Sequence, residues 1–440
     1  MTIDQRAPGV ARRTLLLGTG AAVALQALMS GTATAQPGRS ARPAPGNGGY
    51  GPLQPAPGGE LLLPAGFSYV AFGQTGTIMS DGTPTPGSHD GMAAFDAGPG
   101  RVRLVRNHEE SEGPAFGLPS YDPAAAGGTT SLLFDTRRME LVSSHASLAG
   151  TIRNCAGGPT PSGSWLSCEE TFTPRNLPTP HGYIFEVPSR ADGPVDPVPL
   201  QAMGRLVHEA ICVDPATGIV YETEDQGTAG AYRFIPDDRR NLAAGGRLQM
   251  LAVKDRFQYD TRTGQRAGVP LPVEWVDIDD PDPDSADELA VYNQGRAKGG
   301  AVFSRLEGAW WGDGAAYLVS TSGGDAGLGQ VWEYRPRGRS GGQLQLVYES
   351  TDAALLESPD NITVSPRTNG LVLCEDGSGK DLVRGVTTRG EIFDFCEFNG
   401  PNDSEWAGAT FSSDGRVLFF NLQSPGISYA VTGPWERGAL

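Results

Sequence analysis

The chain has 440 residues, 61 of them glycine and 35 proline, and charged residues make up 19% of it. Such a composition argues against helical bundles and coiled coils and favours a turn-rich, mostly β protein. The 51 acidic side chains outnumber the 34 basic ones, and no basic stripe is present to follow a phosphate backbone, so nucleic-acid binding is not expected.

The N-terminal segment has the pattern of an export signal. Arg12 and Arg13 precede an apolar run and a small-residue cleavage motif that ends at residue 35. This pattern predicts a twin-arginine signal peptide over residues 1–35, recognition by the twin-arginine export machinery, and a periplasmic or secreted product. The apolar run is shorter than the ~20 residues that span a bilayer, so we expect no stable membrane insertion after cleavage. Residues 36–59, rich in proline and glycine, are expected to form a disordered leader.

A glycine followed by aromatic residues recurs through residues 60–440. The copies, of which the first is the weakest, lie at 130–134, 182–185, 230–234, 329–334, 390–395 and 426–429. The intervals between glycines of the last five copies are 48, 99, 61 and 36 residues, and three of these are near the period of a propeller blade. The long interval predicts an insertion between blades, which includes the acidic, proline-rich segment 277–288, expected as a solvated loop.

Each glycine–aromatic copy follows a predicted β-hairpin whose turn contains aspartate, proline or glycine. The paired segments are 92–95 with 102–106, the chain around 156 with 164–167, 210–213 with 219–223, 309–311 with 316–320, 362–365 with 370–373, and 409–412 with 417–420. Six such units predict an all-β, six-bladed β-propeller over residues 60–440. The spare strand at 66–72 is expected to close the ring by joining the last blade.

Metal-ligating residues lie at matching positions of these units. In a propeller, the start of the first strand and the end of the second strand share one face. The starts carry Asp90, Cys155, Glu209, Glu307, Asp360 and Glu405. The ends carry Glu109-Glu110, Glu169-Glu170, Glu224-Asp225, Asp325 and Glu375-Asp376. The sequence therefore predicts that these carboxylates converge on one mouth of the propeller.

Crowded carboxylates raise one another's pKa or require cations. Oxygen-rich ligand sets suit calcium, whereas the thiolate of Cys155 points to a transition metal such as iron or zinc. We therefore expect a mixed metal cluster. The alternatives are an acidic mouth that is merely solvated and a Cys155 that is a buried, inert thiol.

Arg305 lies two residues before Glu307, so an extended backbone places both side chains on the same side. A guanidinium beside such a cluster is suited to bidentate contact with a tetrahedral oxyanion, and the alternative is an ion pair with one of the acids. His108 and His208 each precede a candidate ligand and are expected as hydrogen-bond partners or packed neighbours rather than as bases.

The five cysteines are an odd number, so at least one is unpaired, and they form no CxxC motif. This spacing fits neither a zinc ribbon nor a disulfide-dense scaffold. Besides Cys155, the residues Cys168, Cys374 and Cys396 fall within predicted strands and are expected in the core.

Several of these segments resemble the PhoX family of bacterial alkaline phosphatases. The resemblance is carried by 90–95, 107–109, Asn154-Cys155-Ala156-Gly157-Gly158, 165–170, 208–210 and 305–308, and it extends over residues 60 to about 432. It implies a propeller exported by the twin-arginine route that hydrolyses phosphomonoesters with iron and calcium. It also implies that Cys155 ligates iron, that Glu209 and Glu307 join the iron–calcium cluster, and that Arg305 contacts phosphate. Further ligands implied by the resemblance are Glu109, Glu169, Glu170, Glu224 and Asp225.

The sequence thus predicts a secreted, metal-dependent phosphomonoesterase whose partner is a phosphate-ester small molecule and whose chemistry is metal-assisted hydrolysis. Two alternatives stay open. One is a calcium-dependent propeller hydrolase such as a lactonase, and the other is a non-catalytic extracellular propeller that binds a protein or glycan. Cys155 separates the first alternative from the phosphatase, because a calcium enzyme has no need of a thiolate.

Overall fold

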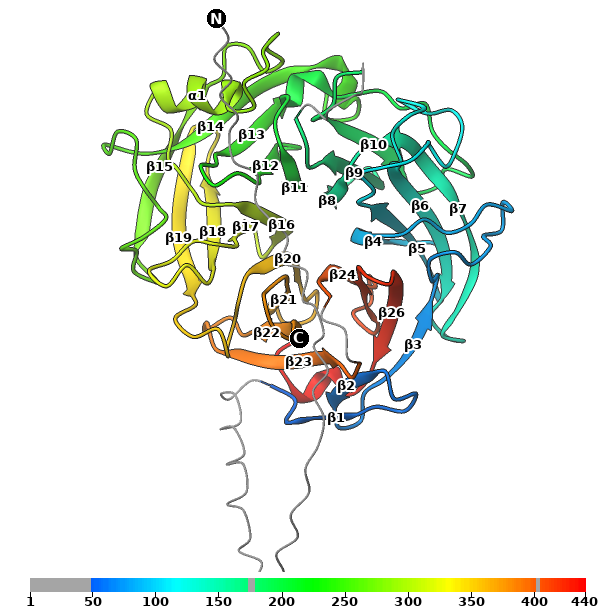
Figure 1. The fold of residues 1–440 in the computed structure, drawn as a ribbon. Helices are drawn as coiled ribbons and strands as arrows, with labels where there is room; N and C mark the ends of the chain where they lie inside the picture. The colour runs from blue at the N-terminus through cyan, green and yellow to red at the C-terminus, as the bar shows by residue number, and fades with distance from the viewer. Residues whose placement is uncertain (1–48, 173–178, 401–403) are drawn as a thin grey trace, which may run out of the picture. The chain divides into compact units, whose positions relative to one another are not determined.

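The computed structural model describes residues 49–172, 179–400 and 404–440 (Figure 1). The predicted signal peptide and residues 36–48 of the predicted leader lie outside these ranges. The regular secondary structure of the described chain is almost entirely β-strand, with one α-helix, α1 (Ala290–Ala297), and short 3-10 turns. Among the described residues, no helix has the length and apolar character needed to cross a membrane.

The strands of the described chain form five antiparallel sheets. The first contains β4 (His89–Asp96), β5 (Arg101–His108), β6 (Gly127–Asp135) and β7 (Glu140–Thr151). The second contains β8 (Asn154–Pro159), β9 (Ser164–Glu169) and β10 (Ile184–Pro188). In each of these sheets, neighbouring strands follow one another in sequence.

The largest sheet has nine strands and consists of two halves. One half contains β11 (His208–Val213), β12 (Val220–Glu224), β13 (Ala231–Pro236) and β14 (Gly246–Val253). The other half contains β16 (Leu306–Gly312), β17 (Ala315–Ser320), β18 (Gln330–Arg337) and β19 (Gly341–Glu349). Strand β15 (Pro270–Asp277) pairs with both β14 and β19 and so joins the outer edges of the halves.

Two further sheets complete the described fold. One contains β20 (Pro359–Val364), β21 (Leu371–Glu375), β22 (Leu382–Val386) and β23 (Ile392–Phe398), extended by β2 (Leu61–Pro64) and β1 (Leu53–Pro55). The other contains β24 (Trp406–Phe411), β25 (Leu418–Leu422), β26 (Ile427–Thr432) and β3 (Ser68–Phe72). The pairing of β3 with β26 confirms that the strand predicted at 66–72 joins the C-terminal sheet.

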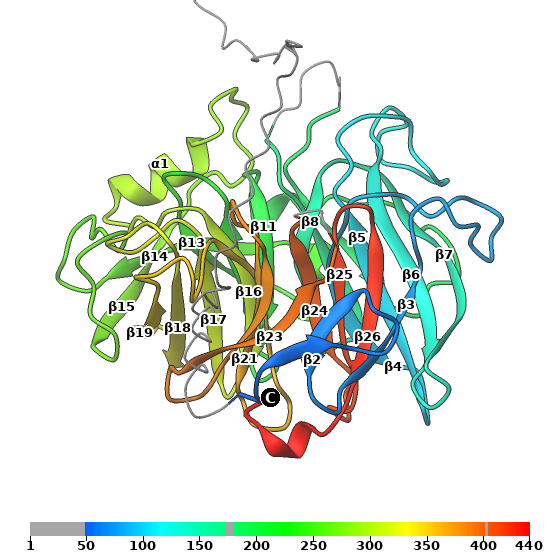
Figure 2. The ribbon, with the colours of Figure 1, turned by 60° about the horizontal axis from the view of Figure 1, so that its bottom comes forward.

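The sheets are arranged as a propeller around a central axis (Figures 1 and 2). The innermost strands are β4, β8, β11, β16, β20 and β24, and each contacts the next until β24 meets β4 and closes the ring. The prediction of an all-β propeller is confirmed, but the six predicted units form five sheets in the described chain because β15 joins two of them.

Three further details differ from the sequence-based expectation. Part of the expected insertion is ordered sheet, namely β14, which is mostly buried, and β15, which alternates between buried and exposed residues; neither strand carries a glycine–aromatic motif. The copy at 390–395 lies on β23, the fourth strand of its sheet. The third strand, β22, is fully buried and does not contain the motif. The end of the expected leader forms β1, and Tyr50 packs its ring against Phe67 and Trp435.

One backbone hydrogen bond repeats around the ring. The residue after each second strand donates its N–H to a carbonyl that precedes the paired innermost strand. In the described chain these bonds, 2.9–3.1 Å long, are Glu109 to Ser88, Glu170 to Arg153, Asp225 to Val207, Thr321 to Arg305, Asp376 to Ser358, and Gln423 to Glu405. The repeat therefore places equivalent residues of each unit at the same level of one mouth.

Buried aromatic and aliphatic side chains hold neighbouring sheets together. Trp332 and Tyr334 from β18 pack with Tyr221 and Phe303 in one core cluster, and Phe395, Trp406 and Tyr429 belong to another. Among the described residues, all cysteines are free and buried, and Cys168, Cys212, Cys374 and Cys396 lie in such clusters. Cys155 is absent from these clusters, which separates it from the structural thiols.

Candidate metal centre

A β-bulge interrupts each innermost strand close to its first residue. The register with the second strand shifts immediately after the first residue of β4, β8, β11, β16 and β20, and one residue later in β24. A bulge adds a residue and re-aims its side chain. Five bulges carry a residue that can ligate a metal, and the bulge of β24 does not; the five residues are Asp90, Cys155, Glu209, Glu307 and Asp360.

All of these bulge residues except Asp90 form a connected cluster at the mouth together with three acids from adjacent loops. The cluster consists of three groups, and within each group one ligand atom of every residue lies within 4.8 Å of those of the other two. The first group is Cys155, Glu170 and Glu209. The second is Glu209, Glu307 and Asp360, and the third is Asp360, Asp376 and Glu405. Glu209 and Asp360 each belong to two groups, so the three are continuous. Cys155 Sγ lies 3.2 Å from Glu209 Oε1 and donates a hydrogen bond to it.

Burial and unmet hydrogen-bonding capacity show that this cluster fits cations. Asp90 and Glu209 are 0% exposed, and Cys155, Glu307 and Asp360 are at most 5% exposed. Among the described residues, Asp90 Oδ1 and Glu209 Oε2 have no hydrogen-bond donor. A buried carboxylate oxygen without a partner is costly, and cation binding removes that cost. Oxygen ligands suit hard cations, and the single thiol suits a transition metal.

The electrostatics of the cluster lead to the same conclusion. Burial, with the charges of neighbouring carboxylates, raises the pKa of Asp90, Cys155, Glu209 and Glu307 well above their usual values. Burial, followed by the charge of Asp376, raises the pKa of Asp360 to about 7. The protein alone therefore favours protonated ligands here, and bound cations would reverse that preference.

Little free space is left in the channel behind the cluster. A cavity of only about 10 Å³ remains there, and its lining includes Ala156, Ala210, Gly308 and Ile362, each of which follows a bulge residue closely in sequence. Such a space holds about one water molecule. The channel directly behind the cluster therefore has little free space.

Arg305 lies at the edge of the cluster in a left-handed backbone conformation, with φ of 47°. Its Nε and Nη2 each donate to an oxygen of Asp225 at 2.9 Å, and Nη2 lies 2.7 Å from Glu307 Oε1. The ion pair considered as an alternative from the sequence is thus present. The Arg305 side chain is nevertheless 42% exposed, which leaves it facing the open mouth.

The structure places Glu169 and Glu224 outside the cluster, contrary to the ligand set implied by the resemblance. Glu169 accepts backbone N–H bonds from Ile152 and Gly182 at 3.0 and 2.8 Å, and its Oε1 lies 2.6 Å from His181 Nδ1. Glu224 accepts bonds from Gly230 N and Tyr232 Oη, both at 2.8 Å. Successive side chains of a strand point to opposite faces, so in the pairs Glu169-Glu170 and Glu224-Asp225 the second acid is the one that faces the mouth.

Glu109 and Asp225 lie beside the cluster and are held by arginines. Glu109 Oε1 is 2.9 Å from Arg153 Nη2, and Glu109 Oε2 accepts a bond of 2.9 Å from Gln423 Nε2. Glu170, which belongs to the cluster, also accepts a bond from Arg153. Of the implied ligands, Cys155, Glu170, Glu209 and Glu307 are therefore the ones that the structure brings within ligand distance of one another.

The implied ligand set omits Asp90, Asp360, Asp376 and Glu405. The signal for them was their position in the repeat, which already marked each as an acid of the mouth. Glu405 occupies a different position in its unit from the others, because it precedes β24 and its carbonyl accepts the repeated hydrogen bond from Gln423. It is equivalent to Arg153 and Arg305 rather than to the bulge residues.

The two histidines make contacts away from the cluster. His108 Nδ1 lies 2.7 Å from the carbonyl of Gly87, and its Nε2 lies 2.9 Å from Thr130 Oγ1. His208 Nε2 lies 3.0 Å from the carbonyl of Gly204, and burial lowers the pKa of His208 to about 4. Both are fully buried hydrogen-bonding residues and are poorly suited to act as bases at the mouth.

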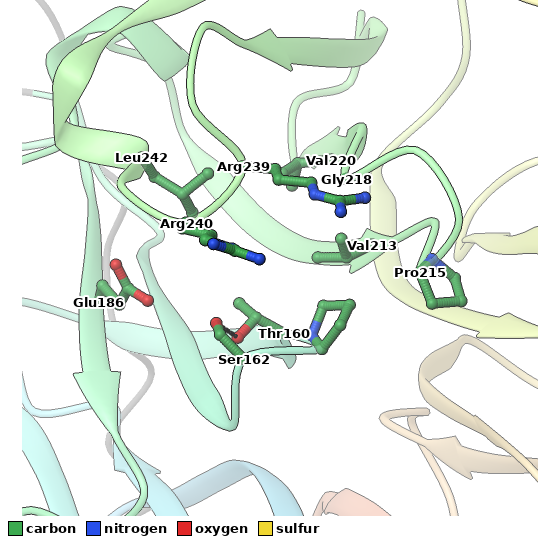
Figure 3. Close-up of a pocket in the computed structure, with 11 residues that line it drawn as sticks. Thr160, Ser162, Glu186, Val213, Pro215, Gly218, Val220, Arg239, Arg240 and Leu242 are labelled. Atoms are coloured by element: carbon green, nitrogen blue, oxygen red, sulfur yellow. Dashed lines mark hydrogen bonds between the residues drawn. The ribbon is translucent and has the colours of Figure 1, made fainter.

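A separate pocket lies where the β8–β9 and β11–β12 hairpins turn, at the strand ends opposite Cys155 and Glu209 (Figure 3). Its volume is about 280 Å³. Arg239 and Arg240 line it together with Val213, Val220 and Leu242. No member of the acidic cluster lines this pocket, so the two features are distinct.

Comparison with known proteins gives one family. The sequence profile of the family described as "Alkaline phosphatase PhoX" matches residues 48–138 and 123–426. No curated protein matches the chain. Pseudomonas fluorescens PhoX, solved in complex with vanadate, a transition state analogue, is 16% identical with a TM-score of 0.68, and the match covers 88% of this chain and 98% of that one.

More distant propellers also match. A gluconolactonase from Xanthomonas campestris is 14% identical with a TM-score of 0.44, covering 89% of this chain and 99% of that one. The WD40 propeller domain of Doa1 is 11% identical with a TM-score of 0.40, covering 84% and 99%. These two likenesses are too weak to bear on function.

Proposed function

Because the chain belongs to the PhoX family of alkaline phosphatases and is thus a phosphoric monoester hydrolase, we propose that it releases phosphate from small organic monoesters at its acidic mouth. The observation that carries this proposal is the continuous cluster of Cys155 and carboxylates, assembled by equivalent bulges and bordered by Arg305. The match to the PhoX–vanadate structure supports the same fold for this chemistry.

We propose that the cluster holds iron and calcium. The thiol of Cys155, with Glu170 and Glu209, offers the mixed set that suits iron. The other groups offer only oxygen, which suits calcium; they are Glu209, Glu307 and Asp360, and Asp360, Asp376 and Glu405. Asp90, with its unpartnered oxygen, is a further candidate ligand. When bound, these ions would neutralise charge on the phosphoryl oxygens and activate water.

The protein's own residues bind and orient the substrate. Arg305 would donate to non-bridging oxygens of the phosphoryl group, because its side chain is partly exposed and its planar fork matches that geometry. Asp225 and Glu307 fix the guanidinium from two sides, which limits its freedom before substrate arrives. The space of about 10 Å³ behind the cluster is too small for an ester, so the substrate would approach from the mouth.

We also propose that the ring consists of six blades and that the protein is exported. Six innermost strands with one repeated hydrogen bond favour six blades in the described chain, although β15 merges two sheets. The arginine pair Arg12-Arg13 favours the twin-arginine route to the periplasm or medium. Replacing both arginines by lysine should leave the unprocessed protein in the cytoplasm, and normal export would contradict this.

The test of the proposed function is phosphate release by metal-replete protein. We expect hydrolysis of p-nitrophenyl phosphate and of several alkyl monoesters at alkaline pH, and its loss when the metals are removed by a chelator. Absence of phosphate release from every monoester by protein that holds its metals would overturn the proposal. Matched lactone substrates, which a calcium-dependent lactonase would open, should remain intact.

A further inference from the structure

Arg153 is the structural counterpart of Arg305 in the ring. Each lies two residues before a bulge residue, Cys155 or Glu307, and each has a left-handed backbone, with φ of 49° and 47°. Their carbonyls accept the repeated hydrogen bond. Their N–H groups donate to the carbonyls of Glu110 and Gln226 at 3.0 and 2.8 Å. The backbone therefore directs both side chains in the same way, and both begin at the same level of the mouth.

The two guanidinium groups also have equivalent acidic partners. Arg153 pairs with Glu109 at 2.9 Å, just as Arg305 pairs with Asp225 at 2.9 Å, and each acid follows the second strand of the preceding unit. Each arginine also contacts an acid of the metal-ligand cluster in its own unit, Glu170 or Glu307. Their side chains are 41% and 42% exposed, so both are equally open to the mouth.

The two arginines differ in how fully their donors are used. Arg305 Nε donates to Asp225. Arg153 Nε is buried and, among the described residues, has no hydrogen-bond acceptor. A guanidinium offers five N–H donors and a buried donor without an acceptor is unfavourable, so Arg153 has donor capacity that its acidic partners do not use.

From this equivalence we propose that Arg153 is a second substrate-contacting residue, which donates to a non-bridging oxygen of the phosphoryl group that Arg305 also contacts. This inference rests on the proposed function. The carboxylates of Glu170 and Asp225, which lie between the two guanidinium groups, interact with each other, so both arginines border one short arc of the mouth. A phosphoryl group has enough oxygens to accept from both.

The experiment compares Arg153→Gln, Arg153→Lys and Arg305→Gln with wild type, using metal-loaded protein. Arg239→Gln, in the pocket of Figure 3, is the matched control for removal of an exposed arginine remote from the mouth. Metal content is measured first, then the Kd of inorganic phosphate by calorimetry, and then kcat and KM for p-nitrophenyl phosphate.

We expect Arg153→Gln to keep its metals and to weaken phosphate binding by about 10- to 100-fold, the range for loss of a hydrogen bond to a charged group. KM should rise by a similar factor. Arg153→Lys should recover only part of the affinity, because an ammonium lacks the planar fork. Arg239→Gln should bind phosphate as wild type does.

Two results would overturn the inference. One is wild-type phosphate affinity in metal-loaded Arg153→Gln. The other is loss of metal from Arg153→Gln combined with wild-type affinity in metal-loaded Arg153→Lys, which would make Arg153 a clamp for Glu109 and Glu170. Failure of the proposed function gives a different signature, in which wild-type protein binds phosphate but releases none from esters.

Discussion

The mouth and the part of the channel directly behind it are built from opposite chemistry. At the mouth, bulges aim buried acids and one thiol at one another, and some of their oxygens have no donor among the described residues. Directly behind it, Ala156 and Ala210, which follow Cys155 and Glu209 in sequence, line together with Ala309 a space of only about 10 Å³. The close packing stabilises the ring, whereas the buried acids of the mouth destabilise the fold until cations bind to them.

Among the substitutions at the mouth, we expect Glu209→Gln to have the largest effect. Glu209 belongs to two of the three ligand groups, so Glu209→Gln should reduce both metal content and phosphatase activity. We expect an activity loss of more than about 100-fold, because even residues that only support metal ligands cost 10- to 100-fold when changed. Activity and metal content of purified protein measure the effect, and near-normal values for both would contradict the assignment.

Arg305 tests the division between metal binding and substrate binding. Arg305→Lys keeps the charge but loses the bidentate contact, so kcat/KM should fall by about 100-fold, comparable to the loss of one oxyanion donor. Metal content should stay unchanged, because Arg305 is not a ligand. A variant that loses its metals together with its activity would instead assign Arg305 a structural role in holding Asp225 and Glu307.

The pH dependence of stability should differ between metal-free and metal-loaded protein. Burial and Asp376 raise the folded-state pKa of Asp360 from 3.8 to about 7, so the folded state binds more protons than the unfolded state between these values. Stability of the metal-free protein should therefore fall as pH rises from about 4 to 7, by an amount on the order of a few kcal/mol. Urea unfolding with a chelator at pH 5 and pH 8 measures this, and equal stabilities would contradict it.

The adjacent acids Glu169 and Glu170 give the smallest and sharpest comparison. Glu169→Gln replaces one of the two oxygens that accept backbone N–H bonds by an NH₂ donor and should cost about 1–3 kcal/mol of stability with metal content unchanged. Glu170→Gln should instead lower metal content with a smaller effect on stability. Thermal unfolding and metal analysis of the two variants test the split, and a reversed pattern would show that the wrong acid was placed at the mouth.

The sequence was sufficient to predict the hairpins, the closing strand and the convergence of acids, because each depends on local alternation and on the repeat. It could not predict β15, whose role depends on edge pairing between distant strands. It also could not decide between Glu169 and Glu170, because the choice depends on the residue at which β9 ends. The bulges that aim Cys155 and Glu209 have no composition signature and are visible only in the register.

The most direct test of the mouth as a metal centre is metal analysis of exported wild-type protein beside Cys155→Ala and Cys212→Ala. Cys212 is the matched control, because it is a buried free thiol packed in a hydrophobic cluster. We predict stoichiometric iron in wild type and in Cys212→Ala, and loss of iron from Cys155→Ala. Iron at the wild-type level in Cys155→Ala would contradict the account.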